Sequence, residues 1–367
     1  MTGRERVLVA IRHAEADRVP RDFWAAPEVF GALRHALRLT DDVAVLEHFG
    51  VDLDYVAGPS YQGQELRSWD TPDGRVVEDL WGVRRVVKHV RRGDLEWSYK
   101  HAIESPLASA QTPADIHAYP RWPDPEAWDY STLREQCRAI RARGRAVVNA
   151  GDRLDRAAQL KTMMYLRGME QTYLDLRCSP EMVEAILGHV TEYFLAYNAK
   201  VFQEAGDLID IFMMGDDFGT QHGPMMSPDL WRKLIKPGFR AYLDLAHGHG
   251  LPVMHHTCGS VVDLIPDFIE CGLDILQSVQ PSAAGMDLAQ LKREFGRDLC
   301  FHGSVDIQHT MPHGTQDEVR DEVRRRMAAG KPGGGFIICS AHNLQPDVPL
   351  GNILALFEAY DEFGRYE

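Results

Sequence analysis

Short apolar runs alternate along this chain with longer stretches in which apolar residues recur every three or four positions. This alternation is typical of parallel strands joined by helices, because a short run fits a buried strand and a periodic stretch fits a covering helix. Eight runs fit strands, which is the number that closes a barrel. They are residues 19–24, 51–58, 146–151, 208–214, 251–256, 274–279, 299–303 and 335–340. The pattern predicts an α/β fold, a (β/α)8 TIM barrel with an N-terminal helical extension.

Two connecting segments carry clear helix boundaries. Ser179-Pro180 is expected to open a helix that ends at Gly206, and Ser227-Pro228 one that ends at Gly250. Residues 59–130 interrupt the alternation. In residues 59–100 the dipeptide Asp73-Gly74, a hairpin signal, lies between extended segments, which predicts a β-rich insertion after the second strand. Residues 105–130 are rich in proline and are expected to form an irregular connector within a single domain of residues 1–367.

Composition and charge narrow the functional classes. The chain has 367 residues, of which 44% are hydrophobic, so it can bury a large core. Its net charge of −14 argues against a nucleic-acid partner, since phosphate binding needs clustered Lys and Arg. The sequence has no run of about 18 apolar residues and its N-terminus is charged, so we expect no membrane span, no secretory signal and a cytoplasmic protein. The six scattered cysteines are expected to be free thiols.

Aromatic residues in the insertion allow two interpretations. Trp69, Trp81, Trp97 and Tyr99 either form a homodimer contact or cover the flank of the barrel.

Polar residues of ligand type follow the last five expected strands. In a parallel barrel these strand ends share one mouth, which is where functional residues gather. The candidates are Asp216 and Asp217, His256 and Cys258, Gln280, His302 and Asp306, and Cys339, His342 and Asn343.

His256 and Cys258 form the first candidate metal site. They lie two residues apart at a strand end, so their side chains point the same way, and an imidazole with a thiolate suits Zn²⁺. The alternative is a hydrogen-bonded histidine beside a buried thiol. Cys339 or His342 from the eighth strand would complete three protein ligands with one open position. Asp217, or its neighbour Asp216, is a further ligand or fixes a ligand's tautomer.

Five residues are assigned roles around the same mouth. Asp217 and His302 are candidate catalytic groups. Gln280, Asp306 and Asn343 are candidate cofactor-binding residues, and His302 and Asp306 are expected to line the cavity. For Asp306 the alternative is a helix N-cap.

Several segments resemble the uroporphyrinogen decarboxylase superfamily over nearly the full length, in particular its cobamide-dependent methyltransferase branch. They are Arg4-Glu5-Arg6-Val7-Leu8, Asp17-Arg18-Val19-Pro20, Gly215-Asp216-Asp217-Phe218-Gly219, His256-Thr257-Cys258-Gly259-Ser260, Gln280-Pro281, Ala284-Gly285-Met286-Asp287, Phe301-His302-Gly303 and His342-Asn343-Leu344-Gln345-Pro346-Asp347.

The resemblance implies a zinc ion held by a His-x-Cys pair and a later Cys. His256 and Cys258 match the pair. His342 stands at the position of the later Cys, and Cys339 lies three residues earlier, so the third ligand is open between them. The true decarboxylase has an Arg-rich signature that holds the acidic arms of a tetrapyrrole. Here residues 21–27 read RDFWAAP, which leaves a porphyrinogen without an arginine clamp.

The favoured function is therefore a zinc-dependent methyltransferase. It would move a methyl group between a corrinoid (methylcobamide) protein and a small acceptor or donor, such as a thiol, tetrahydrofolate or a methoxylated compound. One alternative is a lyase acting on a smaller carboxylic acid, with Asp217 or His302 as the proton donor. Another is a non-catalytic accessory protein that binds a corrinoid or a metal.

Overall fold

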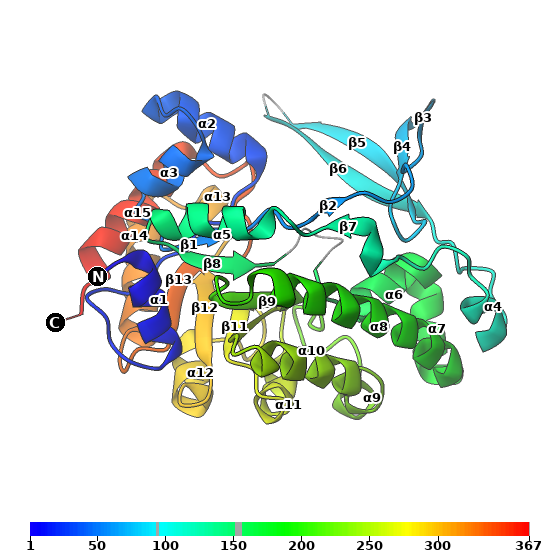
Figure 1. Ribbon diagram of the computed structural model, residues 1–367. Coiled ribbons are helices and arrows are strands. Elements are labelled where there is room, and N and C mark those ends of the chain that lie inside the picture. Colours follow the sequence, from blue (N-terminus) through cyan, green and yellow to red (C-terminus); the bar gives the residue numbers. More distant parts are fainter. Residues whose placement is uncertain (93–94, 151–155, 367) are drawn as a thin grey trace.

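A curled parallel sheet forms the centre of the molecule, and helices cover its outer face (Figure 1). The computed structural model describes residues 1–92, 95–150 and 156–366. Its seven-stranded sheet has the order β1-β8-β9-β10-β11-β12-β13, and every neighbouring pair is parallel. The strands are β1 (Leu53–Tyr55), β8 (Ala146–Asn149), β9 (Ile211–Gly215), β10 (Val253–His256), β11 (Ile275–Val279), β12 (Cys300–Val305) and β13 (Phe336–Ser340). Seven of the eight expected strands are confirmed; Gly151, at the end of the third, lies outside the described residues.

The first expected strand, residues 19–24, is the exception and is not part of the sheet ladder. Its backbone instead makes isolated parallel bridges, Arg21 to Ile338 and Ala25 to Leu344. On the other side the amide of Asp52 donates to the carbonyl of Arg21 at 2.9 Å. The amide of Arg21 donates to the side chain of Asp52 rather than to a backbone carbonyl, and Pro20 has no amide hydrogen, so a continuous ladder cannot form. This segment thus joins the two edge strands of a seven-stranded sheet, in place of the expected eighth strand.

Helices follow most strands and pack their apolar faces on the sheet. The expected helix at Ser179-Pro180 is confirmed, ending before Gly206. The one at Ser227-Pro228 is interrupted at Ile235, because Pro237 lacks the amide hydrogen that a continuous helix would need. The helices are α1 (Gly3–Ile11), α2 (Pro27–Leu37), α3 (Asp42–His48), α4 (Pro113–His117), α5 (Leu133–Ala142), α6 (Leu160–Arg167), α7 (Met169–Cys178), α8 (Pro180–Ala205), α9 (Pro228–Leu234), α10 (Lys236–Gly248), α11 (Ile265–Glu270), α12 (Leu288–Phe295), α13 (Thr310–His313), α14 (Gln316–Gly330) and α15 (Leu350–Phe363), with 3-10 turns η1 (Pro125–Ala127) and η2 (Val262–Leu264).

The β-rich insertion is confirmed as a separate antiparallel sheet beside the parallel one (Figure 1). Its strands are β3 (Ser68–Thr71), β4 (Gly74–Glu78), β5 (Arg84–Arg92) and β6 (Leu95–Glu104), while β2 (Ser60–Tyr61) pairs with β7 (Trp128–Asp129). The expected hairpin turn sits between Thr71 and Gly74, where glycine adopts a φ of 123°.

The aromatic residues of the insertion separate into two kinds. Trp81 is buried and packs edge-on against Tyr193 of α8, so it covers the molecule's own flank and cannot form a dimer contact. Trp69 and Tyr99 are exposed and Trp97 is half-buried, and the homodimer remains a prediction that rests on these three. The single domain over residues 1–367 likewise stays a prediction. No helix among the described residues is long and apolar enough to cross a membrane.

A buried ion network joins the N-terminal segments to β1. The side chain of Asp52 is 2% exposed and lies 2.5 Å from Nη1 of Arg6 and 2.6 Å from Nη1 of Arg18. It also accepts the Arg21 amide at 2.9 Å. Arg6 and Arg18, which belong to two separate N-terminal segments, therefore contact the same Asp52 carboxylate.

Candidate metal centre

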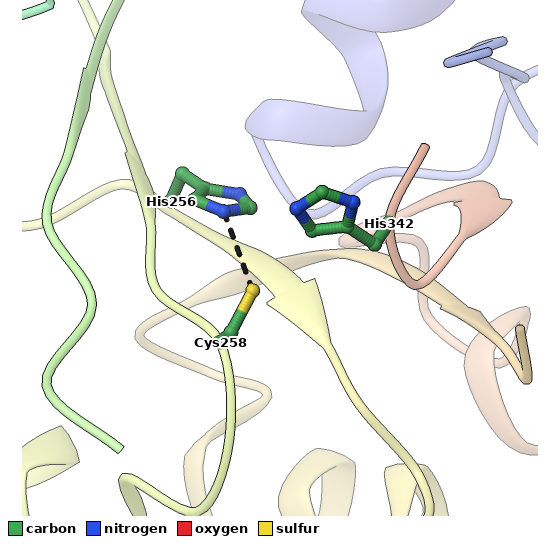
Figure 2. Close-up of side chains that lie close together, drawn as sticks. All are labelled: His256, Cys258 and His342. Carbon is green, nitrogen blue, oxygen red and sulfur yellow. Dashed lines mark hydrogen bonds between the residues drawn. The ribbon is translucent and has the colours of Figure 1, made fainter. Parts of the chain in front are cut away.

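Three donor side chains converge at the carboxyl ends of two strands of the sheet (Figure 2). His256 is the last residue of β10, and Cys258 follows in the loop. His342 lies in the loop after β13, which ends at Ser340. Because parallel strands end at the same edge of the sheet, the two loops meet there. The six free cysteines are confirmed, and Cys258 is the one placed in this group.

The spacing of the donor atoms suits one metal ion. One nitrogen from each histidine and Sγ of Cys258 all lie within 4.8 Å of one another. Sγ of Cys258 is 3.4 Å from Nε2 of His256. Two such ligands on a tetrahedral zinc lie about 3.5 Å apart, given Zn–N near 2.0–2.1 Å and Zn–S near 2.3 Å. A nitrogen, nitrogen and sulfur donor set of this kind leaves a fourth position open.

Neighbouring strands fix the His256 ring. Gln277 of β11 pairs in register with His256, and its side-chain oxygen accepts a close hydrogen bond from Nδ1–H. This places the ring's lone pair on Nε2, the atom that faces Cys258. The indole of Trp24 stacks on the imidazole, with ring centroids 5.6 Å apart. Both contacts pre-orient the ring for a ligand role.

The electrostatics of the pair favour neutral groups before metal binding. Burial, with the Arg156 guanidinium next in effect, lowers the pKa of His256 well below its usual value. Burial and the nearby Asp217 raise the pKa of Cys258 to about 12. At neutral pH the imidazole is therefore deprotonated and the thiol carries its proton. A bound cation would deprotonate the thiol.

Zinc binding at this group should consequently release about one proton, from Cys258. Because the thiol pKa is about 12, this release should persist from pH 6 to 9, and the apparent affinity should rise about tenfold per pH unit. Calorimetric titration of the metal-free protein with zinc in buffers of different ionisation enthalpy measures the proton count. A Cys258→Ser variant that releases as many protons per chain as the wild type would contradict the assignment.

Asp217 adds a carboxylate beside the group. Burial favours its neutral form, yet the Lys161 ammonium 2.8 Å from Oδ2 outweighs burial and holds the pKa well below its usual value. Oδ1 accepts the amide of Cys258 at 3.1 Å and lies 3.7 Å from Nε2 of His256. Its neighbour Asp216 accepts three backbone amides at the start of α6 and is occupied there.

The remaining candidates lie in different places. Asp306 accepts the amides of Gln308, His309 and Thr310 in the turn before α13, although the N-cap residue of that helix is His309, and it lines neither of the two cavities. Gln280 accepts the amide of Gly259 and so supports the loop that carries Cys258.

Cys339 and His302 lie away from the first group. Together with Asp22 they form a second, fully buried group, so the expectation that His302 lines the cavity is wrong. His302 lies in the middle of β12, whereas the residues that line the mouth of a barrel come after the strand ends.

A family model described as uroporphyrinogen decarboxylase (URO-D) matches residues 105–363, well over half of the chain. The chain belongs to this URO-D family. The resemblance seen in the sequence is thereby confirmed.

Relatives of this URO-D family protein include methyltransferases and decarboxylases. A methylcobamide:CoM methyltransferase MtaA from Methanosarcina barkeri is 27% identical over 50% of this chain and 50% of its own. A methylated-thiol–coenzyme M methyltransferase from Methanosarcina mazei is 23% identical over 54% and 49%. A uroporphyrinogen decarboxylase from Chlorobium limicola is 23% identical over 51% of each. The chain thus spans about half the length of the curated relatives it matches.

A solved structure confirms the fold of the URO-D family protein along its whole length. A methyltransferase from Methanosarcina mazei superposes with a TM-score of 0.65 at 20% identity and covers 99% of both chains. At this identity the likeness shows the fold alone.

Two cavities of the URO-D family protein lie beside the group formed by His256, Cys258 and His342. One, of about 410 Å³, is bounded by Trp24, Tyr55, Arg156 and Asn343 together with apolar side chains of the N-terminal segments. The other, of about 610 Å³, lies between the insertion and α6 and is bounded by Lys161 and Asp217. Asn343 thus lines a cavity, as a ligand-contact residue must. Both volumes fall in the range of small-molecule sites.

Sequence reasoning missed four residues of this arrangement. Gln277 lies in the middle of β11 and could have been found from the register that aligns it with His256. Trp24 lies in an expected strand, and its stacking on His256 carries no sequence signal. Lys161 and Arg156 follow the third strand at a distance set by a loop, and no local pattern marks them.

Truncating Gln277 tests its orienting role. The Gln277→Ala variant loses the acceptor for Nδ1–H of His256, so we expect zinc affinity to fall by 10-fold to 100-fold, the usual cost of removing such a partner. Competition with a chelator of known affinity measures the change. The matched control is Gln290→Ala on an exposed helix face, which should leave the affinity unchanged. Equal affinities for wild type and Gln277→Ala would contradict the role.

Proposed function

We propose that this protein is a zinc-dependent methyltransferase that moves a methyl group between a corrinoid protein and a small acceptor or donor. The observation that carries the proposal is the convergence of His256, Cys258 and His342, with donor atoms within 4.8 Å. Relatives named as methylcobamide:CoM and methylated-thiol:CoM methyltransferases support the corrinoid and a sulfur substrate. We place the reaction in the cytoplasm.

We propose His342 as the third ligand in preference to Cys339. His342 shares the group with His256, their ring centroids being 5.5 Å apart, while Cys339 belongs to the second group. Two neutral imidazoles and one thiolate leave the Zn²⁺ site with a net charge of +1. When bound, zinc supplies a Lewis acid that lowers the pKa of a substrate thiol or polarises a methyl-bearing heteroatom.

The chain's own residues prepare this site. Gln277 fixes the His256 tautomer, and Trp24 covers one face of the ring. Asp217, kept ionised by Lys161, is the candidate for taking or returning a proton at the larger cavity. The two cavities offer separate places for the small substrate, beside Asn343, and for the corrinoid, beside Asp217.

Porphyrinogen decarboxylation is not proposed, for a reason seen in the segment that would carry the arginine clamp. Its single arginine, Arg21, is directed to Asp361 at 2.7 Å and to the carbonyl of Gly50. It is thus held by the scaffold. A tetrapyrrole with several carboxylates lacks a partner there.

Metal removal tests the function. The purified chain, incubated with methylcobalamin and a panel of thiols, should produce the absorption change of demethylated cobalamin. Chelation should abolish that change, and zinc should restore it. Product formation that survives complete zinc removal would favour the lyase alternative on a carboxylic acid substrate. Tight corrinoid binding without turnover, with or without zinc, would favour the accessory alternative.

A further inference from the structure

A second group of metal-ligand type lies inside the sheet, away from the first. It comprises Asp22 of the segment that joins the sheet edges, His302 in the middle of β12 and Cys339 in β13. One donor atom from each lies within 4.8 Å of the others. The three residues are exposed by 2%, 0% and 1% respectively. The methyl-transfer proposal makes no use of this group.

Its donor atoms already stand at ligand spacing. Nε2 of His302 is 3.0 Å from Oδ2 of Asp22, close to the about 3.3 Å that separates nitrogen and oxygen ligands on a tetrahedral zinc. The hydroxyl of Tyr55 lies 2.5 Å from the same carboxylate oxygen and supplies a fourth polar atom. The side chains come from two adjacent strands, β12 and β13, and from the segment bridged to β13, so their positions are fixed by the backbone.

Two polar atoms at this place are buried without a hydrogen-bond partner among the described residues. They are Nδ1 of His302 and Oγ of Ser304, the residue that pairs in register with Cys339. An unsatisfied buried polar atom costs about 1–3 kcal/mol, which native proteins rarely accept without a reason. Nδ1 of His302 thus lacks a partner among the described residues, while Nε2, the nitrogen that faces Asp22, is the one a cation would occupy.

The negative charge of the buried Asp22 carboxylate also favours a bound cation. A buried carboxylate needs a countercharge, and within residues 1–92, 95–150 and 156–366 no lysine or arginine forms an ion pair with Asp22. A divalent cation held by the Asp22 carboxylate, the Cys339 thiolate and the neutral His302 imidazole makes a site of zero net charge. Oxygen, nitrogen and sulfur donors together match Zn²⁺.

We propose that Asp22, His302 and Cys339 bind a second, structural zinc ion, with the Tyr55 hydroxyl beside it. This ion fastens the segment of residues 19–26, which has no strand ladder of its own, to β12 and β13. The same segment carries Trp24, whose indole N–H donates to the Tyr55 hydroxyl at 2.6 Å and whose ring stacks on His256. The structural ion thereby holds one wall of the candidate methyl-transfer site.

Metal stoichiometry tests this second site. Elemental analysis of zinc-saturated protein should give two equivalents for wild type, one for Cys258→Ser, one for Cys339→Ser and none for the double variant. Cys178→Ser, which changes an exposed thiol, should keep two. Anomalous scattering at the zinc edge locates each ion. In Cys258→Ser, which keeps only the second site, chelation should lower Tm by several degrees and zinc should restore it, with no such response in the double variant.

One equivalent in wild type, lost in Cys258→Ser and kept in Cys339→Ser, would overturn the second site and leave the methyl-transfer proposal standing. Two equivalents without methyl transfer would do the reverse. Should Cys339→Ser fold poorly, Asp22→Asn gives an independent answer, because the amide preserves the shape and removes the charge that the ion requires. A full two equivalents in Asp22→Asn, with unchanged affinity for both, would also overturn the proposal.

Discussion

Cys258→Ser should reduce methyl transfer by about 10³-fold or more, equivalent to about 4 kcal/mol of barrier. A serine hydroxyl does not ionise beside zinc as a thiol does, so the variant keeps His256 and His342 but loses the anionic ligand. The measurement is the initial rate of methylcobalamin demethylation at saturating thiol, with the zinc content of the same sample. Loss of metal and rate together is the expected result.

Two further variants show whether the loss of rate comes from the metal site. Cys178→Ser, on the surface, should keep the full rate, which excludes a general effect of removing a thiol. His342→Ala should lose both metal and rate if His342 is the third ligand. A Cys258→Ser enzyme that retains a tenth of the wild-type rate while lacking the zinc of this group would rule out a catalytic metal there.

Asp52→Ala should lower the free energy of unfolding by about 3–5 kcal/mol, the cost of removing one partner from a buried ion pair. Asp52 is 2% exposed and contacts Arg6 and Arg18 within 2.6 Å. Its removal leaves the Arg18 guanidinium without its carboxylate partner and leaves Arg6, only 7% exposed, with Asp17 as its remaining partner. It also leaves the amide of Arg21 without its acceptor.

Urea unfolding followed by tryptophan fluorescence measures the change, in saturating zinc so that metal content does not differ. Asp361→Ala is the matched control, since it breaks an ion pair with Arg21 whose carboxylate is 69% exposed. That substitution should cost no more than about 1 kcal/mol. Equal stability of Asp52→Ala and wild type would show that the network contributes nothing.

Most of the fold could be predicted from the sequence because parallel strands here are short, apolar and separated by helical periods. Residues 19–24 could not be placed, because their apolar pattern fits a strand but the amide of Arg21 donates to the Asp52 side chain. Whether that amide joins a ladder depends on tertiary contacts alone. The split between α9 and α10 has a local signal in the sequence, because Pro237 lacks the amide hydrogen of a continuous helix.

At the site, His256 and Cys258 were predictable from their spacing at a strand end. The choice between Cys339 and His342 depends on where β13 ends. Cys339 is still in the strand and points into the buried interior, whereas His342 lies beyond Ser340 and reaches the mouth. Strand ends are the least certain part of any such prediction. The partnership of Asp22 with His302 joins residues far apart in the chain, and no local pattern indicates it.

The junction made by residues 19–26 has a consequence for biosynthesis. The amides of Asp22 and Ala26 donate to the carbonyls of Ile338 and Leu344, residues that leave the ribosome long after them. Until then the growing sheet exposes β1 at one edge and its newest strand at the other, and exposed edges invite pairing with other chains. A nascent chain stalled before residue 338 should therefore need chaperone protection, and dilute refolding should outperform concentrated refolding.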